Sequence, residues 1–168
     1  MNLKSLTIRN YVYSTDFDSD NHLPNCLSML INLEVLSFSF KRTTKLTAEL
    51  KSFCIALSKL TRIQSLYLNM PFFIKGSDIT NLGKGLETMT NLQELTLILK
   101  NTSIRGKEAK DISNSISKLS DLSLFQLRLV CNEKSIPSDF KSIFSELRNL
   151  RNLTTINIHE EDDNYYLR

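Results

Sequence analysis

The chain has 168 residues, of which 41% are apolar and 23% charged, and this balance predicts one folded domain with enough apolar material for a continuous core. The composition excludes a disordered chain, and the apolar runs are strand-sized, far short of the roughly 20 residues that a membrane span requires. A net charge of +3, with basic residues scattered among acidic ones, is too small for a nucleic-acid-binding surface, so we expect neither nucleic acid nor a membrane as a partner.

Six segments share the pattern Leu-x-x-Leu-x-Leu and are predicted as strands. In chain order they cover residues 3–9, 33–39, 63–69, 92–98, 122–128 and 153–159. The apolar residues at the middle of the six patterns are Leu6, Leu36, Leu66, Leu95, Phe125 and Ile156. Their spacings are 30, 30, 29, 30 and 31 residues, and a period this steady predicts stacked units in a single domain over residues 1–168.

The segments between the strands carry a helical pattern. From the second unit onward, apolar residues stand thirteen, nine and six positions before each middle residue. These are Leu23, Leu27 and Leu30; Phe53, Leu57 and Leu60; Leu82, Leu86 and Met89; Ile112, Ile116 and Leu119; and Ile143, Leu147 and Leu150. Steps of four and three mark one face of a helix, whereas the step of two within each strand pattern marks one face of a strand. The predicted fold class is therefore α/β, with six strands and about five helices.

Two further positions of the unit agree with this pattern. Turn-forming residues stand four places before most middle residues, where the chain must leave the helix. They are Asn32, Asn91, Asp121 and Asn152, with Arg62 as the exception. Small residues stand ten places before, where helices are expected to approach one another closely. They are Cys26, Ala56, Gly85 and Ser115, and Glu146 breaks the row.

On these residues the chain resembles the leucine-rich-repeat family, and its units of 29 to 31 residues with full helices resemble the ribonuclease-inhibitor-like subclass. Phrases such as Leu82-Gly83-Lys84-Gly85-Leu86 are similar to the repeat arrays of ciliates and other protists. The resemblance covers nearly the whole chain. It implies a leucine-rich-repeat solenoid, or horseshoe, with a concave parallel sheet, convex helices and a role in binding other proteins.

In such a fold the strand residues that alternate with the buried ones face outward and carry the function. The candidate partner-binding residues of this concave face are Tyr67, Glu94, Gln126, Arg128, Arg9 and Asn69. Tyr67 and Arg128 are the strongest candidates, because both offer a large contact area together with polar groups. Arg9, Asn69 and Arg128 are expected in one row of the sheet.

Catalytic and cofactor sites are not predicted. His22 and His159 are the only histidines and lie at opposite ends of the chain, so no histidine-based metal cluster or catalytic triad is expected. No glycine-rich phosphate-binding loop is present. Residues 16–21 begin like a calcium loop, but Asn21 replaces the turn glycine and Leu27 the bidentate glutamate, so we expect a solvated loop. We predict no enzyme activity and no cofactor or metal.

The three cysteines, Cys26, Cys54 and Cys131, have no metal-ligand spacing and are expected to be buried, reduced thiols. The amino terminus shows no secretory signal pattern, so the expected location is the cytoplasm.

The leading function is therefore a protein-interaction scaffold that binds a partner protein through its concave sheet. The alternative is an architectural subunit of a large assembly that contacts its neighbours through edges and ends. A ribonuclease inhibitor is disfavoured, because an inhibitor of basic ribonucleases calls for negative charge and this chain has a net charge of +3. The first strand pattern has no helix before it, which predicts either a longer array or end-to-end association.

Overall fold

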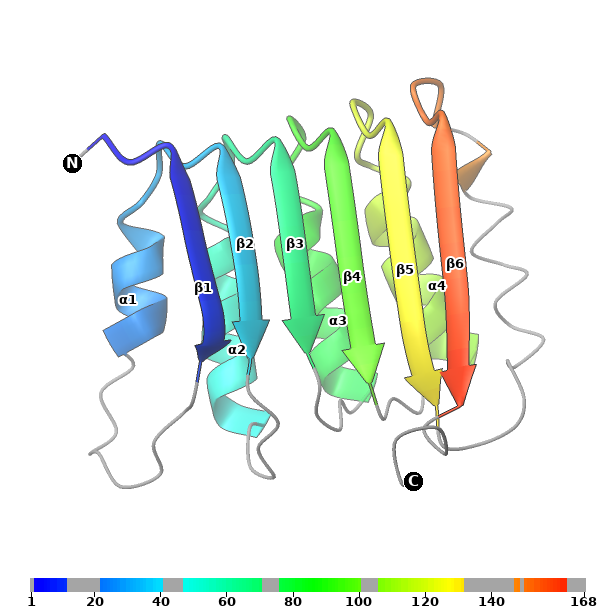
Figure 1. The fold of residues 1–168 in the computed structure, drawn as a ribbon, viewed down its shortest axis with the longest axis horizontal. Coiled ribbons are helices and arrows are strands. Elements are labelled where there is room, and N and C mark those ends of the chain that lie inside the picture. The colour runs from blue at the N-terminus through cyan, green and yellow to red at the C-terminus, as the bar shows by residue number, and fades with distance from the viewer. Residues whose placement is uncertain are drawn as a thin grey trace.

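The computed structural model of the chain contains six strands and four helices within the residues that it describes (Figure 1). The described residues are 2–11, 22–40, 47–70, 76–100, 106–131, 147–148 and 150–162. Strands and helices alternate as far as β5, as the predicted α/β class requires. No helix in these ranges is long and apolar enough to cross a bilayer.

The strands form one open sheet in which each strand pairs with the next in parallel. They are β1 (Ser5–Tyr11), β2 (Val35–Phe40), β3 (Ser65–Met70), β4 (Glu94–Lys100), β5 (Leu124–Cys131) and β6 (Thr155–Asp162). The middle residues of the sequence pattern pair with one another across the whole sheet, from Leu6 beside Leu36 to Phe125 beside Ile156. The predicted parallel sheet and its register are confirmed.

Each strand begins two residues later than the sequence pattern predicts. The first leucine of the pattern still belongs to the turn that follows the helix: the Leu33 amide donates to the Leu30 carbonyl at 2.9 Å, and Leu92 donates to Met89 at 3.0 Å. These leucines are nevertheless buried. Periodicity identified their burial correctly, but it does not distinguish a buried turn residue from a buried strand residue.

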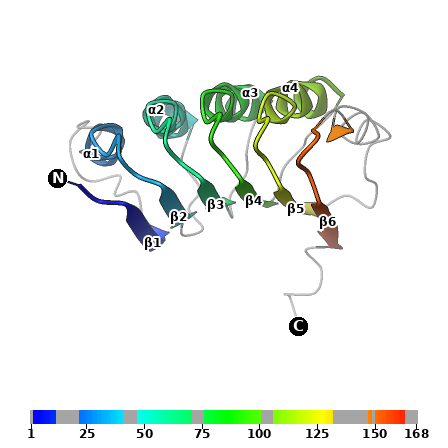
Figure 2. The same ribbon diagram turned by 90° about the horizontal axis from the view of Figure 1, so that it is seen from above.

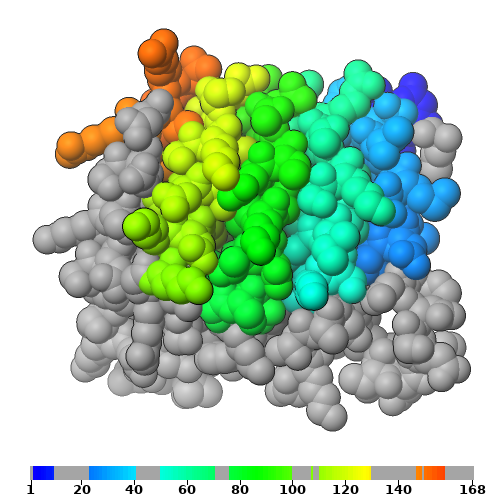
Figure 3. Space-filling view, turned by 180° about the vertical axis from the view of Figure 1, so that it is seen from behind, coloured from blue at the N-terminus to red at the C-terminus, as the bar shows by residue number. Residues whose placement is uncertain are grey.

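All described helices lie in one layer against one face of the sheet (Figure 2). They are α1 (His22–Ser28), α2 (Thr47–Leu57), α3 (Gly76–Leu86) and α4 (Gly106–Ile116). From behind, they form side-by-side ridges (Figure 3). The structure thus has four helices where the sequence predicts about five, because the fifth, expected near residues 143–150, falls largely outside the described residues.

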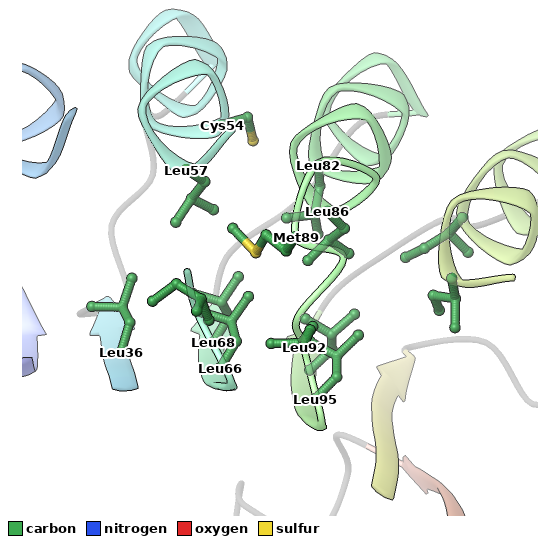
Figure 4. Packing of buried hydrophobic residues seen from close by; sticks show 14 of the residues in the cluster. Leu36, Cys54, Leu57, Leu66, Leu68, Leu82, Leu86, Met89, Leu92 and Leu95 are labelled. Carbon is green, nitrogen blue, oxygen red and sulfur yellow. The ribbon is translucent and has the colours of Figure 1, made fainter. Parts of the chain in front are cut away.

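The core lies between the helix layer and the sheet. Figure 4 shows Leu57, Leu86 and Met89 reaching from the helix layer toward Leu66 and Leu95 of the sheet. All five side chains are buried, and each fully buried leucine contributes about 1.5–3 kcal/mol relative to an exposed one. The three predicted helix rows are buried in the units of α2, α3 and α4, so this part of the pattern is confirmed.

Helix α3 packs closely on both of its neighbours. A Cβ atom at Gly85 would lie 2.9 Å from the backbone carbonyl oxygen of Cys54 on α2, and one at Gly83 would lie 2.6 Å from the Ser115 hydroxyl on α4. Because any larger side chain at Gly85 would push α2 away, the predicted row of small residues sets the helix spacing here. Cys26 of the same row is exposed.

The two outermost strands are less well covered than the inner four. Leu6 and Ile8 of β1 are only partly buried, whereas their partners Leu36 and Phe38 on β2 are fully buried. At the other edge, Ile156 is 40% exposed, although it occupies the same row. The edge strands therefore have one apolar flank that no described strand covers.

Candidate protein-interaction surface

The sheet face opposite the helices, called the open face here, is built from the strand residues that alternate with the core. Its first row is Ser5, Val35, Ser65, Glu94, Leu124 and Thr155. Its middle row is Thr7, Ser37, Tyr67, Thr96, Gln126 and Asn157. Its third row is Ser39, Asn69, Ile98 and Arg128. The strand periodicity of two places these residues on the solvent side, and Figure 1 views this face.

The middle row holds the tyrosine that the sequence favours as a contact. Tyr67 is half-buried between its register neighbours Ser37 and Thr96. The Thr96 hydroxyl donates a hydrogen bond to Gln126 Oε1 at 3.3 Å. Tyr67 and Gln126 are thus separated by a single strand, and Thr96 on that strand is hydrogen-bonded to Gln126.

The first row combines polar and apolar groups. The Ser65 hydroxyl donates to Glu94 Oε2 at 3.0 Å, which holds the exposed Glu94 carboxylate beside β3. Val35 is 39% exposed in the same row, an apolar contact available beside the polar ones.

The third row contains a buried polar atom that no described residue hydrogen-bonds. Asn69 Nδ2 donates to the Ser39 hydroxyl at 3.2 Å, but Asn69 Oδ1 is buried and accepts no hydrogen bond from any described residue. Ile98 separates Asn69 from the half-buried Arg128 in this row.

Five of the six predicted site residues lie together on β3, β4 and β5 of the open face: Tyr67, Asn69, Glu94, Gln126 and Arg128. Their hydrogen-bonding neighbours Ser39, Ser65 and Thr96 were not among the sequence candidates. The strand register could have identified them, because each lies directly opposite a candidate residue on the neighbouring strand.

Arg9 is the sixth predicted site residue. It is exposed on β1, and three strands separate it from Arg128. The β1 register is irregular between Ile8, which pairs with Phe38, and Tyr11, which pairs with Phe40. These two pairs do not assign a partner on β2 to Arg9, so its place in the third row stays a prediction.

The cysteines have different environments. Cys54 is buried on α2, and burial, followed by the nearby Asp78 carboxylate, raises the pKa of its thiol to about 12, so it stays a protonated thiol at neutral pH. Cys26 is exposed, contrary to the sequence expectation, and the Cys131 side chain lies outside the described residues. No described group of three or more His, Cys, Asp or Glu side chains is placed to hold a metal ion. Residues 16–21 of the calcium-like loop lie outside the described ranges.

A second polar region joins α3 to α4 on the opposite side of the molecule. Glu87 accepts from the Ser115 hydroxyl at 3.0 Å and pairs with the Lys118 ammonium at 2.8 Å. The hydrogen bond from Lys118 is the largest of the causes that lower the pKa of the Glu87 carboxyl. Further along the same helices, the Thr80 hydroxyl donates to Asp111 at 2.7 Å. These bonds link two neighbouring helices and satisfy their polar groups, so we read them as structural.

Comparison of the chain with protein-family models and with curated proteins found no match. The function is therefore inferred from the chain's own geometry.

Proposed function

We propose that the chain is a leucine-rich-repeat solenoid of the ribonuclease-inhibitor-like subclass, and that it binds a partner protein through the open, concave face of its sheet. The period of 29 to 31 residues and the single helix layer support this proposal. We also place the protein in the cytoplasm, because the free thiols of Cys26 and Cys54 fit a reducing compartment.

The observation that carries the proposal is the contrast between the two faces of each strand. On the core side, every row of β2, β3 and β4 is occupied by leucine, phenylalanine or methionine. On the open face, each row changes from strand to strand, for example from Ser37 to Tyr67 to Thr96. A rigid core that supports varied side chains is the arrangement by which repeat proteins select their partners.

The composition of the open face favours a protein as the ligand. The face mixes aromatic, aliphatic, amide and charged groups, as in Tyr67, Ile98, Gln126 and Arg128, without a block of one charge. Protein interfaces combine such groups, with tyrosine and arginine supplying much of the binding energy. We propose no catalytic role for this surface and no cofactor.

Site-specific photo-cross-linking tests this proposal. A photoreactive phenylalanine analogue replaces Tyr67 in one variant and Ile55 in the control, since Ile55 is 52% exposed on α2 of the helix layer. In an extract of the source organism, we expect one protein to be cross-linked from position 67 and not from position 55. Equal cross-linking from both positions would contradict a binding site on the open face.

The partner found in this way permits a direct binding measurement. We expect the double variant Tyr67→Ala/Arg128→Glu to lose about 2–4 kcal/mol of binding free energy, as the loss of interface hot spots does. Ile55→Ala, on the helix side, is the matched control and should bind normally. A double variant with wild-type circular dichroism that still binds with unchanged affinity would move the site away from the open face.

A further inference from the structure

The two outer edges of the sheet are the unpaired surfaces of the described fold. β1 pairs with β2 and β6 pairs with β5, and neither pairs with another described strand on its outer side. Leu6 and Ile8 are partly buried on β1, and Ile156 is 40% exposed on β6. Each edge therefore presents strand hydrogen-bonding groups together with apolar side chains, a combination that favours the addition of another strand.

The repeated backbone contacts make these two edges complementary. At each inner junction, one carbonyl accepts two successive amides of the next unit: Lys4 O accepts from Glu34 at 2.8 Å and from Val35 at 3.0 Å. At the last junction, Ser123 O accepts from Thr154 at 2.9 Å and from Thr155 at 3.2 Å. Thr154 is the equivalent of Ser123 in the last unit, so its carbonyl is the next acceptor at the β6 edge. Lys4 and Ser5 are the equivalents of Glu34 and Val35, so their amides are the matching donors at the β1 edge.

A side-chain contact follows the same rule. Asn91 Nδ2 donates to the Thr61 carbonyl of the preceding unit at 2.8 Å, and Asn152 donates to Ser120 at 3.0 Å. The residue at this position before β1 is Asn2, which is exposed, and the equivalent acceptor before β6 is the Arg151 carbonyl. The β1 end thus has a donor, and the β6 end an acceptor, for one more contact of this kind.

An antiparallel β1–β1 pair is the alternative contact at the β1 edge. In such a pair, Lys4 of one copy would approach Arg9 of the other, which like charges disfavour.

We infer that a second copy of this chain docks the outer edge of its β6 against the outer edge of β1, in parallel and in the repeat register, with Ile156 beside Leu6. The strand pairing covers Ser5 to Ile8 and stops there, because the irregularity after Ile8 breaks the register. This contact uses two different surfaces, so each copy keeps one edge available and association continues beyond a dimer. It is one form of the architectural role that the sequence leaves open, and it does not depend on binding at the open face.

Sedimentation velocity of the purified chain provides the first test. From about 1 to about 100 µM, we expect the average mass to rise with concentration and to pass that of a dimer, as head-to-tail contacts require. A strictly monomeric chain over this range, or a mass that stops at the dimer, would overturn the inference.

Two edge variants provide the second test. The Val35 amide of β2 points toward β1, because it donates to Lys4 O. Ser5 is the equivalent residue of β1, and alternate strand residues point the same way, so the Thr7 amide faces the outer edge of β1. Thr7→Pro removes this amide. Ile156→Lys places a charge in the β6 seam, a device that protects natural sheet edges. Thr7→Val and Ile156→Val are the controls and should associate like the wild type.

Thr7→Pro and Ile156→Lys are each expected to be monomeric. A mixture of the two should form a one-to-one dimer and nothing larger, because each variant retains the edge that the other has lost. If Thr7→Pro prevents association but Ile156→Lys does not, the contact is a β1–β1 pair and the inference fails.

Discussion

Leu95 and Leu6 are the same residue at the same position of two strands, but the structure treats them differently. Leu95 on β4 has no solvent exposure, while Leu6 on β1 is only partly buried. The strand residues around them follow the same pattern, so the strand sequence does not explain the difference. Leu95 follows α3 and lies between β3 and β5, whereas Leu6 has β2 on one side and no described strand on the other. In a sheet built from equivalent units, burial is set by the neighbours of a unit as much as by its own residues.

The largest expected effect is the loss of stability in Leu95→Ala, and Leu6→Ala is the matched comparison. Leu95→Ala should lower the free energy of unfolding by about 2–5 kcal/mol, because it leaves a cavity in the packed centre. Leu6→Ala should cost about half of that or less, since its side chain already contacts water on one side. Urea denaturation of both variants measures the difference. Equal costs would mean that the β1 edge is as well covered as the centre, and a cost under about 1 kcal/mol for Leu95→Ala would mean that Leu95 is not buried.

An intermediate effect tests how tightly the inner helices are spaced. Gly85→Ala should destabilise the fold by about 1–3 kcal/mol, because the new methyl group meets the Cys54 backbone carbonyl and α2 must move. Gly83→Ala is the matched variant on the same helix. Its methyl group meets the Ser115 hydroxyl oxygen, which a change of the Ser115 rotamer moves away at the cost of its bond to Glu87. The gain in helix propensity, about 1 kcal/mol, should offset most of the cost at Gly83.

Thermal unfolding of the two glycine variants distinguishes them. A Gly85→Ala variant as stable as Gly83→Ala would show that α2 shifts freely on α3. The inner part of the helix layer would then lack the tight packing that distinguishes the inner strands from the edge strands.

The smallest effect concerns the polar contact between α3 and α4. Glu87→Gln should cost under about 1 kcal/mol at neutral pH, because the pair with Lys118 is largely solvent-exposed. Lys118 lowers the pKa of Glu87 below its usual value of 4.5, so the contribution is present above pH 4.5 and is lost as the pH falls through the lowered pKa. Denaturation of both proteins across this pH range should show their difference shrinking in acid. A difference that grows in acid would contradict the direction of the pKa shift.

Much of this fold was predictable from the sequence because its units repeat. The step of two within a strand and the steps of three and four within a helix depend on local geometry, so they identified the register from Leu6 to Ile156 and the buried helix rows. The same alternation placed five of the six candidate contacts on the open face. Whether that face binds a protein remains a prediction.

Other features depended on contacts between units. The sequence suggested that Asn91 and Asn152 favour a turn, whereas the structure shows each donating to a carbonyl of the preceding unit, 30 and 32 residues earlier. Single-chain periodicity contains no information about such a bond, because it depends on how neighbouring turns stack.

The sequence by itself determined which residues face the core and which strands are neighbours, since alternating chemistry along the chain allows one register that buries every apolar row. Only the tertiary structure decided where each strand begins, that β1 loses its register after Ile8, and that Leu6 and Ile156 stay partly exposed. The physical reason is that hydrogen bonds and burial at these places are made with residues about 30 positions away, or are left unmade at an edge. The strand pattern recurs in all six units, but the neighbours that complete each strand differ.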